Sequence, residues 1–107
     1  MASATAARVL RRVFDGVDAP ITFRLWDGTT TRVGRGEARF AIVFRSRPVF
    51  RRILLRPTPL RFGEAFIAGE LDIEGDIFAA MRTATAIEGL RVPLGTRLAV
   101  LGSLFRV

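Results

Sequence analysis

Acidic side chains form the one pattern in this sequence that could support catalysis or metal binding. The chain has no Cys and no His, which removes thiol nucleophiles, imidazole bases and the usual zinc ligands. Glu70, Asp72 and Glu74 are spaced by two residues, so they would share one face of a strand and could hold a divalent cation. Alternating charges on the wet face of an edge strand explain the same spacing, because they discourage edge-to-edge pairing. We favour that second interpretation.

No cofactor motif accompanies these carboxylates. Gly34 and Gly36 lack the third glycine and the following helix of a dinucleotide fingerprint. The sequence also has no glycine-rich phosphate loop. We therefore expect no catalytic residue, no metal site and no cofactor, and hence no enzyme in this chain alone.

Basic side chains are the second group that could bind a ligand. All 17 basic residues are Arg, and the formal net charge is +7. Arg keeps its charge at ordinary pH and holds phosphate in a planar fork. These residues cluster in two places, namely Arg8, Arg11 and Arg12, and then Arg45, Arg47, Arg51, Arg52 and Arg56. Nucleic acid, anionic phospholipid headgroups and an acidic partner domain are the three partners that the charge leaves open, and plain solvation is the alternative.

Aromatic residues help to separate these explanations. Recognition of single-stranded nucleic acid generally needs exposed aromatic rings interleaved with the charge. Most Phe residues fall at core positions of the expected strands and helices, and Trp26 is the one aromatic predicted on an outward face. Nucleic acid is therefore the less favoured partner. No apolar run approaches the length of about 20 residues that a spanning helix needs, so we expect a cytoplasmic protein whose membrane contact is peripheral, at the inner face.

Periodicity in the first half of the chain predicts a helix followed by strands. Residues 6–14 have helical spacing, with Ser3 or Thr5 as the cap. Three alternating stretches then follow, at residues 21–26, 29–33 and 38–44, and a turn at Asp27–Gly28 joins the first two as a hairpin. We interpret these stretches as a three-stranded meander.

The second half predicts helices around one further strand. Pro48 suits the first turn of a helix that the prolines at 57 and 59 would end. The stretch Phe62–Gly75 resembles an edge strand with an acidic outer face, and Asp76 would cap a helix carrying Ile77, Phe78 and Met81. A last helix is expected within Leu94–Val107. Together these elements predict one α+β domain over residues 1–107, with a mostly antiparallel sheet of four to five strands packed by helices.

The segment Phe62–Asp76, with sequence FGEAFIAGELDIEGD, resembles a hallmark of the cyclopropane-fatty-acyl-phospholipid synthase family of S-adenosylmethionine-dependent lipid methyltransferases. Leu25–Thr29 is similar to an apolar-X-Asp-Gly hairpin of the same family, so the likeness spans about Pro20 to Met81. A looser similarity joins Phe66–Asp76 to sterol-carrier-type lipid-binding domains. The resemblance implies the family's N-terminal, lipid-facing domain in a sterol-carrier-like fold. The methyltransferase domain that would bind the cofactor has no counterpart in these 107 residues.

This resemblance implies a non-catalytic accessory or lipid-binding role beside a lipid methyltransferase. Candidate lipid-binding residues are Phe62, Gly63, Glu64, Phe66, Ile67 and Gly69. Candidate headgroup-binding residues are Arg47, Arg51, Arg52 and Arg56. The aromatic residues of the first group are equally well explained as ordinary core. A small basic nucleic-acid-binding protein is the alternative function, and the sequence leaves a homodimer and a methyltransferase partner open.

Overall fold

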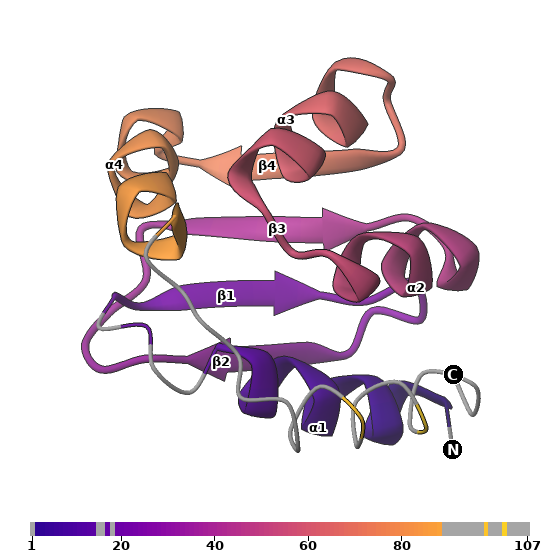
Figure 1. Cartoon of the computed structure of the whole chain (residues 1–107). Coiled ribbons are helices and arrows are strands. Elements are labelled where there is room, and N and C mark those ends of the chain that lie inside the picture. The colour runs from indigo at the N-terminus through magenta and orange to yellow at the C-terminus, as the bar shows by residue number, and fades with distance from the viewer. Residues whose placement is uncertain (1, 15–16, 18, 89–97, 99–101, 103–107) are drawn as a thin grey trace.

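The computed structural model describes residues 2–14, 17, 19–88, 98 and 102. Within these residues the chain forms four helices and four strands (Figure 1). In chain order they are α1 (Ala2–Val13), β1 (Ile21–Arg24), β2 (Thr30–Val33), β3 (Phe40–Phe44), α2 (Arg47–Leu55), α3 (Pro59–Ile67), β4 (Leu71–Gly75) and α4 (Ile77–Glu88). The expected α+β class is confirmed.

The strands form one sheet in the order β2-β1-β3-β4. β1 pairs with β2, and β3 with β4, in antiparallel fashion, whereas β1 and β3 are parallel. The sheet is thus mostly antiparallel, as predicted, but the three-stranded meander is wrong, because β3 passes β2 and pairs with the other edge of β1. The composition of β3 explains this central place. Ala41 and Val43 make its second face apolar as well, which suits an interior strand better than an edge.

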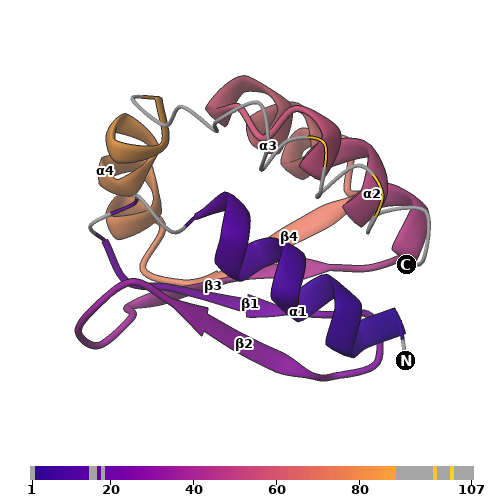
Figure 2. The same cartoon turned by 60° about the horizontal axis from the view of Figure 1, so that its bottom comes forward.

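All four helices lie over one face of the sheet (Figure 2). α1 contacts β2, α2 contacts β3, α3 contacts β4, and α4 covers the ends of β3 and β4. The covered face carries alternate buried side chains from every strand, among them Phe23, Ile42, Phe44 and Leu71. The opposite face carries polar and charged residues of the same strands, such as Arg24, and within the described part of the chain no helix covers it.

Aromatic rings form the centre of the core. Phe44 lies 5.0 Å from Phe50 of α2 and 6.0 Å from Phe23 of β1, measured between ring centroids. Phe14, just after α1, lies 5.1 Å from Phe23 and extends the cluster toward β2. Trp26 packs edge-on against Phe50 at 5.6 Å, so its predicted outward position is wrong. The indole is partly buried and packs against the core.

The stretch Phe62–Gly75 differs most from the sequence-based prediction. Its first half is the end of α3, and the strand itself begins only at Leu71. Pro59 begins this helix because Thr58 caps it, accepting a hydrogen bond on Oγ1 from the Arg61 backbone N–H at 3.3 Å. Pro59, which was expected to help end the helix that begins near Pro48, therefore also begins α3.

The junction from β4 to α4 follows the sequence-based prediction. Asp76 caps α4 through Oδ1, which accepts from the backbone N–H groups of Phe78 at 3.0 Å and Ala79 at 3.1 Å. The predicted caps of α1 are wrong, because the helix begins at Ala2 and includes both Ser3 and Thr5. The final helix expected within 94–107 lies outside the described residues, apart from positions 98 and 102. Among the helices described, none is long and apolar enough to cross a bilayer.

Candidate lipid-facing surface

The residues proposed to contact lipid divide between the core and the surface. Phe62 is only 8% exposed, and its ring lies 6.3 Å from Phe14 and 6.4 Å from Phe44. Phe66 is half-buried and packs against the same core. These contacts support the core interpretation of the two rings.

The remaining lipid candidates lie toward solvent. Ile67, the last residue of α3, is 86% exposed, which is the largest exposure among the large apolar side chains described. Glu64 and Gly69 are exposed, and Gly63 is partly exposed within α3. Of this group, Ile67 is the one large apolar side chain free to contact a ligand.

The four headgroup candidates lie on or just after α2. Its buried positions (Val49, Phe50, Ile53 and Leu54) face the sheet, which leaves Arg47, Arg51, Arg52 and Arg56 on the outer side. Arg52 Nη2 donates to Glu70 Oε1 at 2.6 Å. This hydrogen bond lowers the pKa of the Glu70 carboxyl and raises that of the Arg52 guanidinium. Arg52 is therefore already engaged by a carboxylate.

The carboxylates on β4 also have arginine partners. On the uncovered face of the sheet, Arg24 Nη2 donates to Glu74 Oε2 at 2.6 Å, across the intervening strand β3. Arg45 lies 3.7 Å from Asp72, again measured between nitrogen and oxygen. Glu70 belongs instead with α2, so the predicted common face for all three carboxylates is wrong. These exposed ion pairs contribute little stability individually, but they neutralise the acidic edge strand.

Helix α4 exposes a group of apolar side chains that sequence reasoning treated as part of its packing face. Phe78 is 68% exposed, Met81 65% and Ile77 41%, whereas Ala79 is buried against the sheet. We refer to Ile77, Phe78 and Met81 as the α4 apolar face. The sequence did contain a sign of this exposure. Residues 77–81 are all apolar and surround the helix, and one side of a helix can bury only some of them.

The α4 apolar face and Ile67 lie along the same edge of the sheet. α3 ends where the edge strand β4 begins, and α4 follows the end of that strand (Figure 1). A strand of five residues is about 17 Å long. Exposed apolar side chains therefore lie close to both ends of β4 in the chain.

Residues 7–89 match the family described as "Domain of unknown function (DUF7884)". The match covers most of the chain, from α1 through α4, so the chain belongs to this family. No curated protein matches the chain. The family description states no activity, and a function has to be argued from the surface itself.

Proposed function

We propose that this chain is a non-catalytic, lipid-binding accessory domain that attaches peripherally to anionic phospholipid, at the cytoplasmic face of a membrane. The observation that carries the proposal is the α4 apolar face, exposed on a domain with a net charge of +7. Exposed large apolar side chains that cluster on one element indicate an interaction site more often than scattered ones do. A cationic domain with such a helix combines the two attractions that hold peripheral proteins on anionic bilayers.

The second half of the proposal concerns a partner. The likeness of Phe62–Asp76 to cyclopropane-fatty-acyl-phospholipid synthases supports work beside an S-adenosylmethionine-dependent lipid methyltransferase. In that arrangement this domain holds the lipid surface, and the partner supplies the cofactor and the chemistry. The uncovered face of the sheet, with Arg24, Glu74, Arg45 and Asp72, offers a polar surface for such a partner.

Vesicle flotation tests the lipid half. We expect the chain to float with vesicles that contain phosphatidylglycerol, and to float less with phosphatidylcholine alone or at high salt. Phe78→Ser and Met81→Ser should each weaken binding. Leu55→Ser is the matched control, because Leu55 is an exposed apolar residue at the end of α2, away from α4 (Figure 1). Equal binding by the α4 variants and the control would contradict the proposal, as would retention of DNA or RNA instead of lipid at near-physiological salt.

Co-purification tests the partner half separately. A lipid methyltransferase encoded in the same genome should co-elute with this chain when the two are co-expressed. Arg24→Glu would reverse the charge that faces Glu74 and should weaken the complex while the chain still binds vesicles. Separate elution of the two wild-type proteins would contradict the partner half and leave the lipid half standing.

A further inference from the structure

A cavity of about 310 Å³ lies beside α4, at the end of the sheet where β1 and β3 begin. Its apolar lining comes from Pro20 before β1, Phe40 at the start of β3, and Ala79 of α4. Phe40 and Ala79 are themselves buried parts of the core. Its charged lining comes from Arg39 and Arg82 together with one carboxylate. This size is at the lower end of the range for ligand sites, about 300–1,000 Å³.

The charges of this cavity suit a ligand with a single negative charge. Among the residues described, neither Arg39 nor Arg82 has a carboxylate within 4.0 Å. Glu37 brings one negative charge against these two positive ones, which leaves the lining with a net charge of about +1 at neutral pH. A phosphodiester carries one negative charge, and a guanidinium group binds its oxygens through two parallel hydrogen bonds. The Thr83 hydroxyl donates its proton to the Ala79 carbonyl at 2.9 Å, so the donors that this lining offers a phosphodiester are the two guanidinium groups.

One backbone junction joins the two segments that carry these arginines. The Arg39 carbonyl accepts a hydrogen bond from the Asp76 backbone N–H at 2.9 Å. Asp76 in turn caps α4, the helix that carries Arg82. Gly75 allows this approach, since a Cβ atom there would lie 2.6 Å from the same Arg39 carbonyl oxygen. The segment before β3 and the start of α4 are thus fixed against each other, which preorganises the site.

Arg82 also connects the cavity to the α4 apolar face. It follows Phe78 by four residues and Ala79 by three, so it lies between the exposed ring on one side and the cavity wall on the other. A phosphate held in the cavity would therefore lie next to side chains suited to acyl chains. That is the arrangement of charge and apolar surface in a phospholipid at a bilayer surface.

We propose that Arg39 and Arg82 bind the phosphodiester of a phospholipid headgroup in this cavity. This inference rests on the proposed function and specifies which surface of the domain recognises the lipid. It replaces the α2 arginines as the specific headgroup site, because Arg52 is occupied by Glu70 and the cavity lies beside α4. A soluble phosphodiester has the same chemistry, so the test must separate the two sources.

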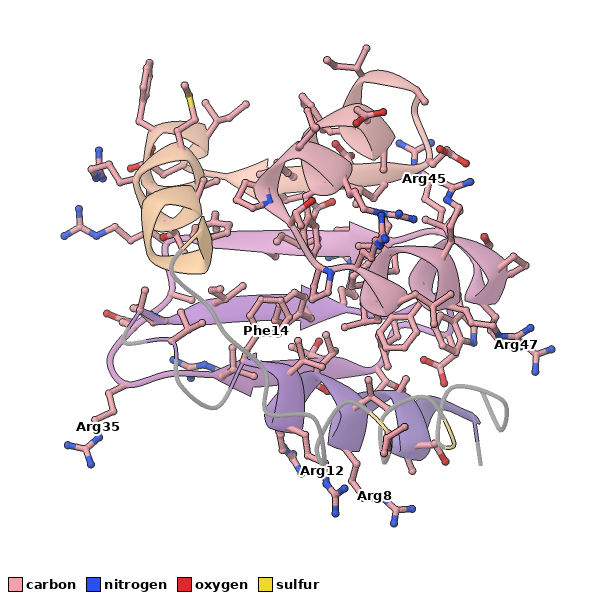
Figure 3. The ribbon with its side chains drawn as sticks, in the orientation of Figure 1. Arg8, Arg12, Phe14, Arg35, Arg45 and Arg47 are labelled. Carbon is pink, nitrogen blue, oxygen red and sulfur yellow. The ribbon has the colours of Figure 1, made fainter. Side chains whose placement is uncertain are left out.

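Vesicle binding of two charge-matched variants provides the test. Arg39→Gln/Arg82→Gln removes both positive charges of the cavity, and Arg8→Gln/Arg12→Gln removes two positive charges from α1, the helix that contacts the edge strand β2 (Figure 3). With phosphatidylglycerol-containing vesicles, we expect the first variant to lose about thirty-fold in affinity, from roughly 1 kcal/mol for each arginine at the surface. The control should lose less than about three-fold, because Arg8 and Arg12 do not line the cavity and exposed charges are screened by salt.

A titration followed by NMR separates the lipid from soluble phosphate. Glycerophosphoglycerol, the headgroup without acyl chains, should shift the amide signals of Phe40 and Thr83 in the wild type and leave them unshifted in Arg39→Gln/Arg82→Gln. If the two double variants bind vesicles equally while the wild type binds, the cavity is not the headgroup site and the proposed function still stands. If, in that case, glycerophosphoglycerol still shifts the amide signals of Phe40 and Thr83, the cavity binds a soluble phosphodiester and not the lipid headgroup. A wild type that binds no vesicles would overturn the proposed function itself.

Discussion

Replacing Phe62 by Ala separates a core residue from a lipid-contacting one. The ring is 8% exposed and lies within 6.4 Å of two other buried rings, those of Phe14 and Phe44. Truncating a buried Phe to Ala costs about 3–5 kcal/mol, from lost transfer free energy and the cavity left behind. A domain of this size has a free energy of unfolding of roughly 5–15 kcal/mol. We therefore expect Phe62→Ala to lose a large fraction of its stability, on the order of 3–5 kcal/mol.

Urea unfolding followed by tryptophan fluorescence measures this loss. Trp26 is the only Trp in the chain, and it packs against Phe50, so its emission reports on core packing. Phe78→Ala is the matched control, since the same ring is removed from a position that is 68% exposed. The control should change the free energy of unfolding by no more than about 0.5 kcal/mol. Both variants should keep the wild-type dependence on urea concentration, because the surface exposed on unfolding hardly changes.

The opposite pattern would refute this assignment. A loss of less than about 1 kcal/mol in Phe62→Ala, together with weaker vesicle binding by the folded variant, would show that the ring faces lipid. Weaker vesicle binding in Phe78→Ala at unchanged stability is the result that the proposed function predicts.

Three further changes test local features of the fold. Gly75→Ala should lower the free energy of unfolding by more than about 2 kcal/mol, because Gly75 has a positive φ and an added Cβ would clash with backbone atoms. Gly28→Ala is the control: Gly28 also has a positive φ but open space around it, so the cost should be about 1 kcal/mol. Thermal melting compares the two variants. Asp76→Ala removes the cap of α4 and should cost about 1 kcal/mol in the same assay. Arg52 lowers the pKa of the Glu70 carboxyl in the folded state, so this carboxyl adds to the free energy of unfolding at pH values above the ordinary glutamate pKa. That contribution is lost as the pH falls through the lowered pKa of the folded state. Arg52→Gln should therefore raise the Glu70 pKa in an NMR titration, and an unchanged pKa would show that the ion pair does not form in solution.

Elements specified by neighbouring residues could be predicted from the sequence. The hairpin of β1 and β2 follows from Asp27–Gly28, where Gly28 has a φ of 87° and Asp27 Oδ1 accepts from the Thr29 backbone N–H at 2.9 Å. α2 follows from Pro48 in its first turn and the apolar spacing after it. In each case the signal and the structure that it specifies lie within a few residues of each other.

Features that depend on distant contacts could not be predicted. The parallel pairing of β1 with β3 depends on which edge of β1 is free, and alternation within each strand is the same for either edge. The alternation that predicted a strand lies in residues 67–74, and residues 62–67 belong to α3, which the Thr58 cap begins and which buries Phe62 and Ala65 on one side. The cavity could not be predicted either, because its lining residues Pro20, Arg39 and Arg82 come from three separate segments of the chain.

The segment that suggested a lipid-related family serves mainly structural purposes in this domain. Phe62 fills the core, Gly69 has a φ of 76° in the turn after α3, and Asp76 caps α4. Such residues identify a fold, since each satisfies a backbone or packing requirement, but none of them presents a group to a ligand. Ile67 is the one large apolar side chain of the segment that is exposed, and the other groups assigned to lipid, the α4 apolar face and Arg82, come directly after the segment or beyond it. Substitutions that test lipid binding should therefore be made at the exposed residues of α4. There we expect them to leave the fold intact and to weaken binding of the proposed ligand.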